Sequence, residues 1–416
     1  MSMQSLMVLG RQPELGLAEL ESLYGNGAIR KVGNKTAVVD VDPCWMAFDR
    51  LGGSVKFCKL LTTLDVIDWY LIEKYLLEVS PGFSSTMPPG KMQLGLSLIG
   101  YDTSVKRIHA SGLKLKRAIM KTGRPVRLIP NQDLELNSAQ VKHNRLTSEN
   151  GWELVIVRDG RQTLIAQTIK VQDISFYAKR DRGRPKRDPK VGMLPPKLAQ
   201  IIINLAVGQL PQNKLESICE IPAGQPIPKP LFNQSLLDPF CGTGVILQEA
   251  LLMGYDVNGS DIDQKMIDYS QQNILNWLKQ WYEFETDAKI EQADATNDNW
   301  QKFGQIDFVA SETYLGRPFT SPPTSQILSQ TISDCNLIIK KFLKNIYNQI
   351  APGARLCLAI PAWSLGTAEF RFLPLIDQIS DLGYNRVSFE HSRDQDLIYY
   401  RKGQIVARQL LVITRK

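Results

Sequence analysis

Residues that would indicate metal or disulfide chemistry are scarce in this chain of 416 residues. Its six cysteines are scattered, without a CxxC pair or a CxxC…HxxxH spacing, so we expect no metal site. The three histidines, His109, His143 and His391, are far apart in the sequence and show no metal-ligand spacing, which favours structural roles. Isolated thiols of this kind are typical of proteins in a reducing compartment.

Long apolar runs are missing as well. No stretch of 18 apolar residues occurs, which predicts that the chain has no membrane span. The short apolar run at 6–9 is followed at once by Arg11 and Pro13, which is not a secretory pattern. We therefore expect a cytoplasmic protein. Internal repeats and low-complexity tracts are also missing.

What remains is the composition of a globular protein, with 43% hydrophobic and 22% charged residues. A chain of this length exceeds what one hydrophobic core usually organises, so two or three domains are expected. The formal net charge of +7 is modest. It is compatible with a polyanionic partner if the positive charge is clustered on the surface.

Hydrophobic periodicity predicts the elements of the first half of the chain. It indicates strands at 6–9, 37–41, 92–98, 126–129, 154–157 and 163–168, and helices from Pro13 to Gly25, over 68–77 and over 111–121. Asp159-Gly160, between the last two strands, predicts a type I′ hairpin. Residues 179–190 contain seven basic residues among prolines and glycines, and we expect a connector there rather than a packed element.

The second half contains a glycine-rich loop after a predicted strand. Residues 235–237 form that strand, Asp238-Pro239-Phe240-Cys241-Gly242-Thr243-Gly244 follows, and a helix begins at Val245. Glycines let the backbone turn tightly and approach a ligand, while the helix start offers free amides. A carboxylate at the strand end can meet a positively charged amino-acid group, where a phosphate would be repelled.

Acidic residues also follow the next two predicted strands. Asp261 comes after residues 256–260, in a position suited to ribose hydroxyls, and Asp294 comes after 288–292, where it can accept a hydrogen bond from an adenine amine. From Leu236 onward the alternation of elements predicts a parallel α/β sheet, whose strand ends share one crevice. The alternative is that these carboxylates are loop caps and turn formers.

With these residues in view, the chain resembles the THUMP-containing RNA guanine-N2 methyltransferases, and most closely their tRNA guanine-10 branch. Beside the glycine loop and Gly259–Asp263, three segments carry the resemblance: Leu9–Leu20, Leu113–Val157 and Arg182–Leu205. It implies an α/β fold in which an α+β ferredoxin-like/THUMP region precedes a Rossmann-like, seven-stranded methyltransferase domain. The implied parts are a ferredoxin-like region (1–80), a THUMP RNA-binding domain (81–172), a basic linker with an entry helix (173–230) and the methyltransferase domain (231–416).

The resemblance also implies the function. It indicates transfer of a methyl group from S-adenosylmethionine to the exocyclic N2 amine of a guanine in tRNA, at position 10. The sequence gives no basis for inferring a small activating subunit. The residues expected to bind the cofactor are Asp238, Phe240, Cys241, Gly242, Thr243, Gly244, Asp261, Ile262, Asp294 and Ala295.

One motif departs from the family. Its catalytic Asp/Asn-Pro-Pro-Tyr, expected after a strand at 307–310, is replaced by Ser311-Glu312-Thr313-Tyr314. We expect Ser311 or Glu312 to supply the oxygen that accepts from the base amine and Tyr314 to stack on the base. The alternatives are a different acceptor atom, a tRNA-binding protein without catalysis, and a DNA adenine-N6 methyltransferase, which uses the same amine chemistry.

Two groups of basic residues predict contacts with RNA phosphates. One is the basic run at 179–190. The other lies on and around the helix predicted at 111–121, and its members are Lys106, Arg107, Lys114, Arg117, Lys121, Arg124 and Arg127. The alternative is a solvated basic surface. The residues expected to contact RNA are Lys114, Arg117, Lys121, Lys179, Arg180, Arg182, Arg184, Lys186 and Arg187.

Overall fold

The computed structural model describes residues 4–188, 193–221, 225–228, 231–282, 288–319, 321–364, 366 and 369–416. The chain divides into two compact units: residues 1–13, 27–48 and 54–174 form the first, and residues 14–26, 49–53 and 175–416 the second. Lys190, the last residue of the predicted basic run, lies outside the described residues. No helix in the described ranges is both long and apolar enough to cross a membrane.

The first unit is built on a mixed sheet with the strand order β2-β3-β1-β4-β8-β7-β5-β6. Neighbouring strands are antiparallel, except that β5 is parallel to both β7 and β6. Its elements are β1 (Ser5–Leu9), β2 (Ile29–Val32), β3 (Thr36–Val39), β4 (Ser54–Leu64), α2 (Trp69–Ser85), β5 (Met92–Ile99), α3 (Val105–Met120), β6 (Val126–Leu128), α4 (Ser138–His143), β7 (Gly151–Asp159) and β8 (Gln162–Val171).

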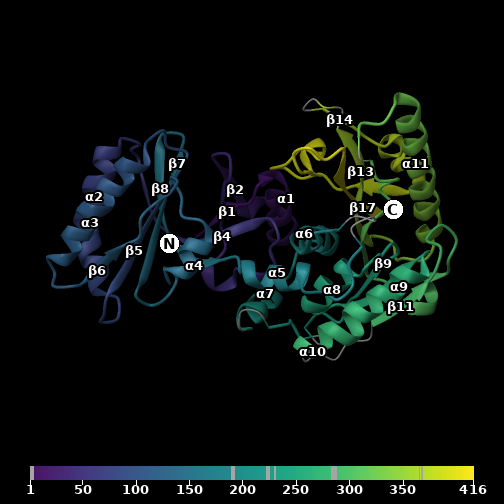
Figure 1. Cartoon of the computed structure of the whole chain (residues 1–416), viewed down its shortest axis with the longest axis horizontal. Helices are drawn as coiled ribbons and strands as arrows, with labels where there is room; N and C mark the ends of the chain where they lie inside the picture. Colours follow the sequence, from purple (N-terminus) through teal and green to yellow (C-terminus); the bar gives the residue numbers. More distant parts are fainter. Residues whose placement is uncertain are drawn as a thin grey trace. The chain divides into compact units, whose positions relative to one another are not determined.

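Helices α2 and α3 lie side by side on one face of this sheet (Figure 1). Asp68 caps the start of α2, and Ser104 caps α3 earlier than predicted, because its hydroxyl accepts from the amide of Arg107. Helix α2 continues past Leu77, the predicted end, and Phe83 in its last turns stacks on Trp152 at 4.3 Å between ring centroids. Both predicted helices are confirmed, and both are longer than predicted.

The predicted hairpin between β7 and β8 exists, but its turn is of another type. Asp159 pairs with Gln162, so the two turn residues are Gly160 and Arg161. Only Gly160 has a positive φ, of 57°, whereas a type I′ turn requires positive φ at both turn residues. A single glycine at the first position is the pattern of a type II′ turn. The type I′ prediction is therefore wrong.

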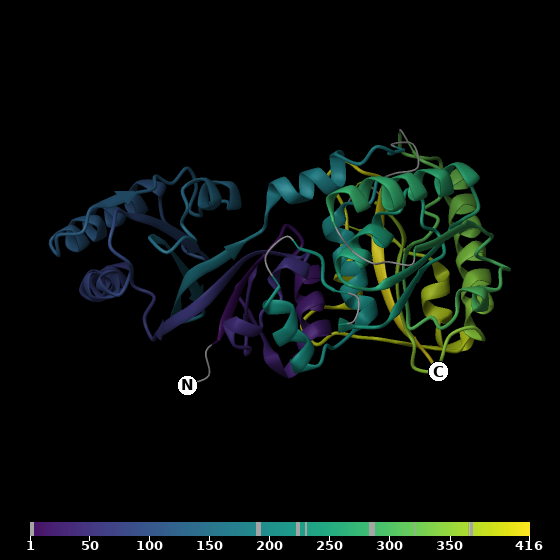
Figure 2. The same ribbon diagram turned by 90° about the horizontal axis from the view of Figure 1, so that it is seen from below.

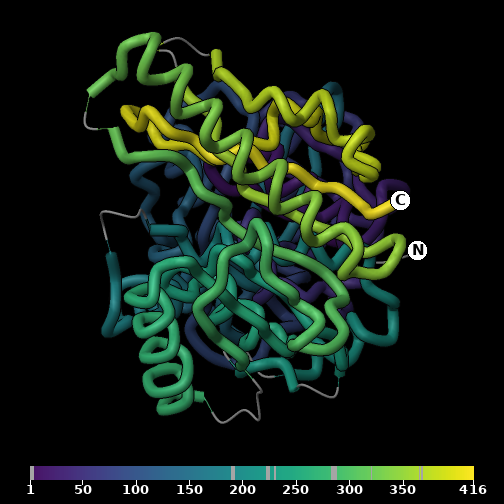
Figure 3. Tube along the Cα trace, turned by 90° about the vertical axis from the view of Figure 1, so that its right-hand side faces the viewer, coloured from purple at the N-terminus to yellow at the C-terminus, as the bar shows by residue number. Residues whose placement is uncertain are grey.

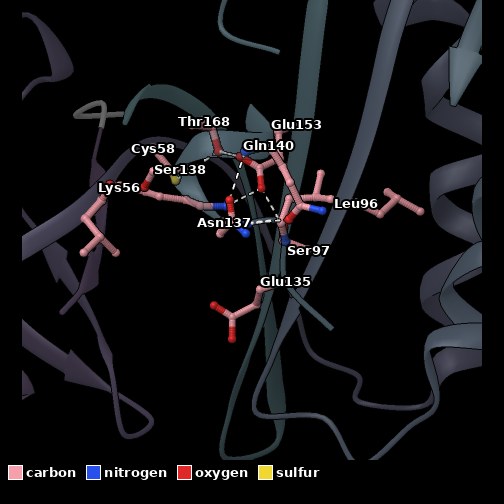
Figure 4. Close-up of polar contacts among 12 residues, drawn as sticks. Lys56, Cys58, Leu96, Ser97, Glu135, Asn137, Ser138, Gln140, Glu153 and Thr168 are labelled. Atoms are coloured by element: carbon pink, nitrogen blue, oxygen red, sulfur yellow. Dashed lines mark hydrogen bonds and ion pairs between the residues drawn. The ribbon is translucent and has the colours of Figure 1, made fainter. Parts of the chain in front are cut away.

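A buried polar network crosses the middle of the first unit (Figure 4). Glu153 on β7 accepts hydrogen bonds from Lys56 on β4, from Ser97 on β5 at 2.6 Å and from Thr168 on β8 at 2.6 Å. Ser97 Oγ in turn accepts from the amide of Leu136 at 2.9 Å, just before α4. A buried charge is stable only when it is paired and hydrogen-bonded, as Glu153 is here.

Because β4 pairs with β8, strands from residues 1–80 and from residues 81–172 share one continuous sheet. The boundary at residue 80 stays a prediction.

The second unit contains a sheet with the strand order β11-β10-β9-β12-β13-β17-β15. The first five strands are parallel, and β17 runs antiparallel to β13 and β15. In chain order these seven strands are arranged 3-2-1-4-5-7-6, with the order reversing between β9 and β12. The short strands β14 and β16 add to the sheet beside β13 and β17. The expected Rossmann-like sheet is confirmed.

The elements of the second unit are α1 (Pro13–Tyr24), α5 (Ile174–Arg182), α6 (Pro196–Val207), α7 (Gln212–Cys219), β9 (Ser235–Asp238), α8 (Val245–Leu252), β10 (Asp256–Asp261), α9 (Gln264–Gln271), the π-helix η5 (Gln272–Leu278), α10 (Lys279–Trp281), β11 (Ala288–Gln292), β12 (Phe308–Glu312), α11 (Ser325–Tyr347), β13 (Arg355–Ser364), β14 (Phe370–Arg371), β15 (Tyr384–Arg386), β16 (Ile398–Tyr399) and β17 (Val406–Arg415).

Helices cover both faces of this sheet, and the alternation of side chains along the strands sets the two cores. Leu236 and Leu410 face α6 and α8, while their neighbours Leu237 and Leu411 face α11. Figure 2 shows α6 on one side of the yellow strands and α11 on the other, and Figure 3 shows α11 running diagonally across them. Burial on both faces explains the continuous apolar run of β13 from Leu356 to Trp363.

Helix α1 packs in the second unit although it lies in sequence between β1 and β2 of the first. Its Glu19 is fully buried and accepts hydrogen bonds from the amides of Gly52 and Gly53 and from the side chain of Asn204 on α6. Burial raises the pKa of Glu19 to about 7, although these bonds lower it. The segments 14–26 and 49–53 are thus bound into the methyltransferase-like sheet unit by hydrogen bonds.

Candidate functional site

Three carboxylates stand at the C-terminal ends of neighbouring parallel strands. Asp238 is the last residue of β9, Asp261 the last of β10 and Glu312 the last of β12, and β9 lies between the other two. The order of strands reverses between β9 and β12, which is where open α/β sheets bind ligands. The prediction that Asp238 and Asp261 end neighbouring strands is confirmed.

The loop after β9 has the backbone that its glycines were expected to allow. Gly242 and Gly244 have φ angles of +51° and +82°, in the left-handed region that side chains disfavour. The Gly242 amide donates to Asp261 Oδ2 at 3.0 Å, and the Cys241 amide donates to the carbonyl of Ser260 at 2.8 Å. The loop is therefore bound to the end of β10, and space is open beside Gly242, where an added Cβ would meet nothing within 4 Å.

Helix α9 and the π-helix η5 support this loop from the other side. Ser270 Oγ donates to the carbonyl of Gly242 at 2.6 Å, and Asn273 Nδ2 donates to the carbonyl of Thr243 at 2.9 Å. A Cβ on Gly244 would lie 3.0 Å from both Ser270 and Ile274. Sequence reasoning missed these supports, because Ser270 and Asn273 have the pattern of ordinary polar helix residues.

Asp238 is buried, and its carboxylate is directed toward Ser311. Ser311 Oγ donates to Asp238 Oδ1 at 2.6 Å, and the amide of Phe240 donates to the same oxygen at 3.3 Å. Burial raises the pKa of Asp238 to about 8, while these two hydrogen bonds lower it and the charges of Asp261 and Glu312 raise it further. A buried carboxylate with few partners is suited to meet a cation that enters the site.

The other predicted cofactor residues have different environments. Burial also raises the pKa of Asp261, and the next residue, Ile262, exposes 69% of its side chain. Asp294 Oδ1 accepts from the amide and the hydroxyl of Thr296, so the turn-forming interpretation accounts for that oxygen. Ala295 is buried, and Phe240 packs edge-on against Phe342 of α11.

The variant motif spans the end of β12: Ser311 and Glu312 are the last two residues of the strand, and Thr313 and Tyr314 follow it. Ser311 is completely buried, and the amide of Thr313 donates to the carbonyl of Ala359 on β13 at 3.1 Å. Tyr314 exposes 42% of its surface. Of the two candidate oxygen acceptors, Ser311 is thus occupied inside the protein, whereas Glu312 is partly exposed at the strand end.

Glu312 has a partner that sequence reasoning missed. Arg408 on β17 donates from Nε to Glu312 Oε1, and the Arg408 side chain is only 9% exposed. The two residues are 96 positions apart, and no local pattern connects them. The ion pair fixes the direction of the one partly exposed carboxylate of the motif.

The predicted connector at 179–190 is wrong for its described part, residues 179–188. Helix α5 extends to Arg182, and Arg180 and Arg184 are buried. Arg180 forms an ion pair with the buried Glu249 of α8 at 3.3 Å. The Pro and Gly content suggested an open loop, but buried partners on α8 and in the glycine loop fold the segment onto the sheet unit.

The other predicted RNA-binding residues are mostly on the surface. Arg182 and Arg187 are exposed and Lys186 is partly exposed, while Lys179 lies 3.2 Å from the centroid of the exposed Trp281 ring. On α3, Arg117 and Lys121 are exposed, whereas Lys114 forms an ion pair with Glu73 at 2.8 Å. Helix α3 contains no acidic residue.

Comparisons with known proteins agree with this geometry. Residues 230–360 match the model of a family described as RMKL-like, methyltransferase domain. A tRNA (guanine(10)-N2)-dimethyltransferase of Methanothermobacter thermautotrophicus is 28% identical over 215 residues, which are 51% of this chain and 52% of that protein. The chain thus spans about half the length of the curated relative that it matches. Neither finding tests the THUMP assignment.

Two solved structures follow most of the chain at low similarity. TrmN from Thermus thermophilus has a TM-score of 0.47 and 15% identity, with 100% of both chains covered. A possible methylase from Clostridium difficile has a TM-score of 0.44 and 13% identity, with 98% of this chain and 97% of that chain covered. Because both TM-scores are below 0.5, we draw no conclusion from them. The family match and the geometry of the glycine loop identify residues 230–360 as a methyltransferase domain.

Proposed function

We propose that this protein transfers a methyl group from S-adenosylmethionine to the exocyclic N2 amine of a guanine in tRNA. The observation that carries the proposal is the group of three carboxylates, Asp238, Asp261 and Glu312, around the glycine loop of the methyltransferase domain. The named relative, a tRNA (guanine(10)-N2)-dimethyltransferase, supports tRNA as the substrate and position 10 as the site.

The residues present fit this cofactor. Asp238 is a buried acid whose side chain accepts hydrogen bonds from two donors among the described residues, and it suits the ammonium of the methionine part. Asp261 suits the ribose hydroxyls, and the exposed Ile262 gives an apolar surface for the adenine ring. When bound, S-adenosylmethionine supplies an electrophilic methyl group on a positively charged sulfur.

The chain's own residues would then orient the base. The lone pair of a guanine amine is delocalised into the ring, so the amine needs acceptors that direct it toward the methyl carbon. The Glu312 carboxylate, held by Arg408, accepts from one N–H, and Tyr314 stacks on the ring. Methyl transfer would leave the amine with one proton to release, and the Glu312 carboxylate that accepts its N–H would receive it.

A second candidate function is tRNA binding without catalysis. It is favoured by one observation: Ser311, which stands where the family has Asp or Asn, is buried and donates to Asp238. An outward acid or amide at this position would accept from the base, and a buried serine does not. Glu312 is therefore the residue on which the catalytic proposal depends.

The test measures label transfer from radiolabelled S-adenosylmethionine to an unmodified tRNA transcript, with duplex DNA as the parallel substrate. The proposal expects label on tRNA and none on DNA. Label on DNA adenines alone would instead support the adenine-N6 alternative. If both the cofactor and tRNA bind measurably but no label is transferred, the binding function is the correct one.

A further inference from the structure

The segment Arg180–Asp188, which we name the strap, lies directly on the methyltransferase domain. Its inward residues each have a partner there: Arg180 pairs with Glu249 of α8, and Asp188 accepts from Lys265 of α9 at 2.7 Å. The strap is fixed at both ends of its described length. It therefore runs from the middle of α8 to the first turn of α9, the two helices that follow β9 and β10.

Between these ends the strap reaches the glycine loop. Arg184 Nη1 donates to the hydroxyl of Thr243 at 3.2 Å, and the Arg184 residue is only 3% exposed. Thr243 lies between the two glycines that carry positive φ angles. The loop is thus held through a side chain that comes from a segment nearly 60 residues earlier in the sequence.

Asn273 joins the strap and the loop. Its Nδ2 donates to the carbonyl of Thr243 and to the carbonyl of Lys186, both at 2.9 Å, and its Oδ1 accepts from the amide of Lys186 at 3.0 Å. The Asn273 residue is 1% exposed. All three of these bonds go to backbone atoms, two in the strap and one in the loop.

The helix that carries Asn273 is itself unusual. It changes from α9 to a π-helix at Gln272, and longer π-helices are rare and often occur near functional sites. Ser270, Asn273 and Ile274, at i, i+3 and i+4, all contact the glycine loop. One helix face therefore contacts the glycine loop, and the strap contacts the same loop through Arg184.

We infer that Asn273 and Arg184 are positioning residues that keep the glycine loop in its cofactor-binding shape. They set the affinity for the cofactor by acting through Thr243, and the inference rests on the proposed function. A loop that already has its bound conformation loses less conformational freedom when a ligand binds, which gives tighter binding. Without these bonds, the loop has more conformations available before binding.

The sharpest variant is Asn273→Asp, which has almost the same shape. It replaces the donor that faces two carbonyls by an acceptor, so two hydrogen bonds become repulsive contacts. The second variant, Arg184→Gln, removes the guanidinium that holds the Thr243 hydroxyl. The matched control is Asn131→Asp in the first unit, because Asn131 Nδ2 also donates to two carbonyls, those of Leu96 and Asp133.

The experiment measures, for the full-length chain, the dissociation constant of S-adenosylhomocysteine by calorimetry and the KM and kcat for S-adenosylmethionine. Asn273→Asp and Arg184→Gln are each expected to bind S-adenosylhomocysteine about tenfold more weakly or worse. KM for S-adenosylmethionine should rise by a similar factor, and in Asn273→Asp both kcat at saturation and tRNA affinity should stay nearly unchanged. Asn131→Asp should keep the wild-type cofactor affinity.

Equal cofactor affinity in wild type and both folded variants would overturn the inference and leave the proposed function standing. A fall in kcat and tRNA affinity as large as the rise in KM would also overturn it, because general loss of structure then explains the effect. If the wild type does not bind S-adenosylhomocysteine, the proposed function and this inference both fail. If Asn273→Asp does not fold, Arg184→Gln decides.

Discussion

Ser311 Oγ donates a hydrogen bond of 2.6 Å to Asp238 Oδ1, and this bond joins the end of β12 to the end of β9. It connects the position of the family's catalytic acid or amide to the first carboxylate of the glycine loop. The serine therefore serves the cofactor side of the site, and Glu312 is left as the partly exposed acceptor.

The raised pKa of Asp238 predicts how cofactor affinity depends on pH. The neutral acid is favoured below about 8, and only the carboxylate form attracts an ammonium group. We expect the affinity for S-adenosylhomocysteine to rise by about tenfold per pH unit between pH 6 and 7 and to level off above pH 8. Calorimetry across this range checks it. Asp238→Asn should bind weakly and without this slope, and an identical slope in that variant would contradict the assignment.

The raised pKa of Asp238 also predicts that its charged form lowers the stability of the fold. A carboxyl group whose folded pKa lies above its unfolded value stabilises the fold at low pH, and that contribution is lost as pH rises from about 4 to about 8. Asp238→Asn removes the buried charge, so we expect its free energy of unfolding at pH 8 to exceed that of the wild type by roughly 1–3 kcal/mol. Urea unfolding at pH 5 and pH 8 measures this difference, which should shrink at pH 5. An equal difference at both pH values would contradict it.

Glu312→Gln should separate catalysis from binding. The amide keeps the shape but loses the charge that orients the amine and stabilises its positive charge during transfer, so kcat should fall by about 100-fold. Cofactor affinity should change little, because Glu312 lies on the other side of Asp238 from Asp261. Single-turnover methyl transfer measures the effect, with the exposed Glu149→Gln as the control. A kcat close to that of the wild type would remove Glu312 from the mechanism.

Two exposed strap residues give a test of the proposed RNA surface. Arg182 and Arg187 are exposed, whereas the neighbouring Arg180 and Arg184 are buried. We expect the double variant Arg182→Gln/Arg187→Gln to bind tRNA more weakly, and the slope of log K against log salt to fall by about 1 for each lost phosphate contact. Filter binding at several salt concentrations checks this, with the exposed Arg393→Gln as the control. An unchanged slope would show that neither arginine contacts phosphate.

The Glu153 network predicts a large local effect on stability. Lys56→Met leaves Glu153 charged and buried without its cation, and breaking a buried pair in this way costs about 3–5 kcal/mol. We expect the first unit to unfold at a lower temperature, with cofactor affinity unchanged. Calorimetric melting with and without S-adenosylhomocysteine separates the two effects. The conservative Thr168→Ser keeps a donor to Glu153 and should have a much smaller effect.

Sequence patterns predicted the elements well where the pattern is local. The strands at 235–238, 256–261 and 288–292 follow from hydrophobic periodicity and turn residues, and Asp238 and Asp261 follow from their places after strands. The sequence does not predict the partners of these residues. Arg408, Asn273 and Arg184 act over long separations in sequence, and a polar residue on a helix or strand carries no mark of a distant partner.

The strap also shows what composition cannot predict. Its arginines, glycine and proline have the composition of an exposed connector, and a surface that binds phosphates has the same composition. Arg180 is buried because it pairs with Glu249, and Glu249 stands among the apolar residues of α8, where the sequence does not mark it as the partner of an arginine. Composition alone could therefore not separate the inward arginines from the outward ones.

The central claim is best tested by identifying the nucleoside that the protein methylates. An unmodified tRNA transcript is incubated with the full-length chain and S-adenosylmethionine, digested to nucleosides and analysed by mass spectrometry. The account predicts N2-methylated guanosine, mapped to position 10, with the product reduced by about 100-fold in Glu312→Gln. Methylation at another atom, or no methylated nucleoside despite measurable binding of both the cofactor and tRNA, would contradict it.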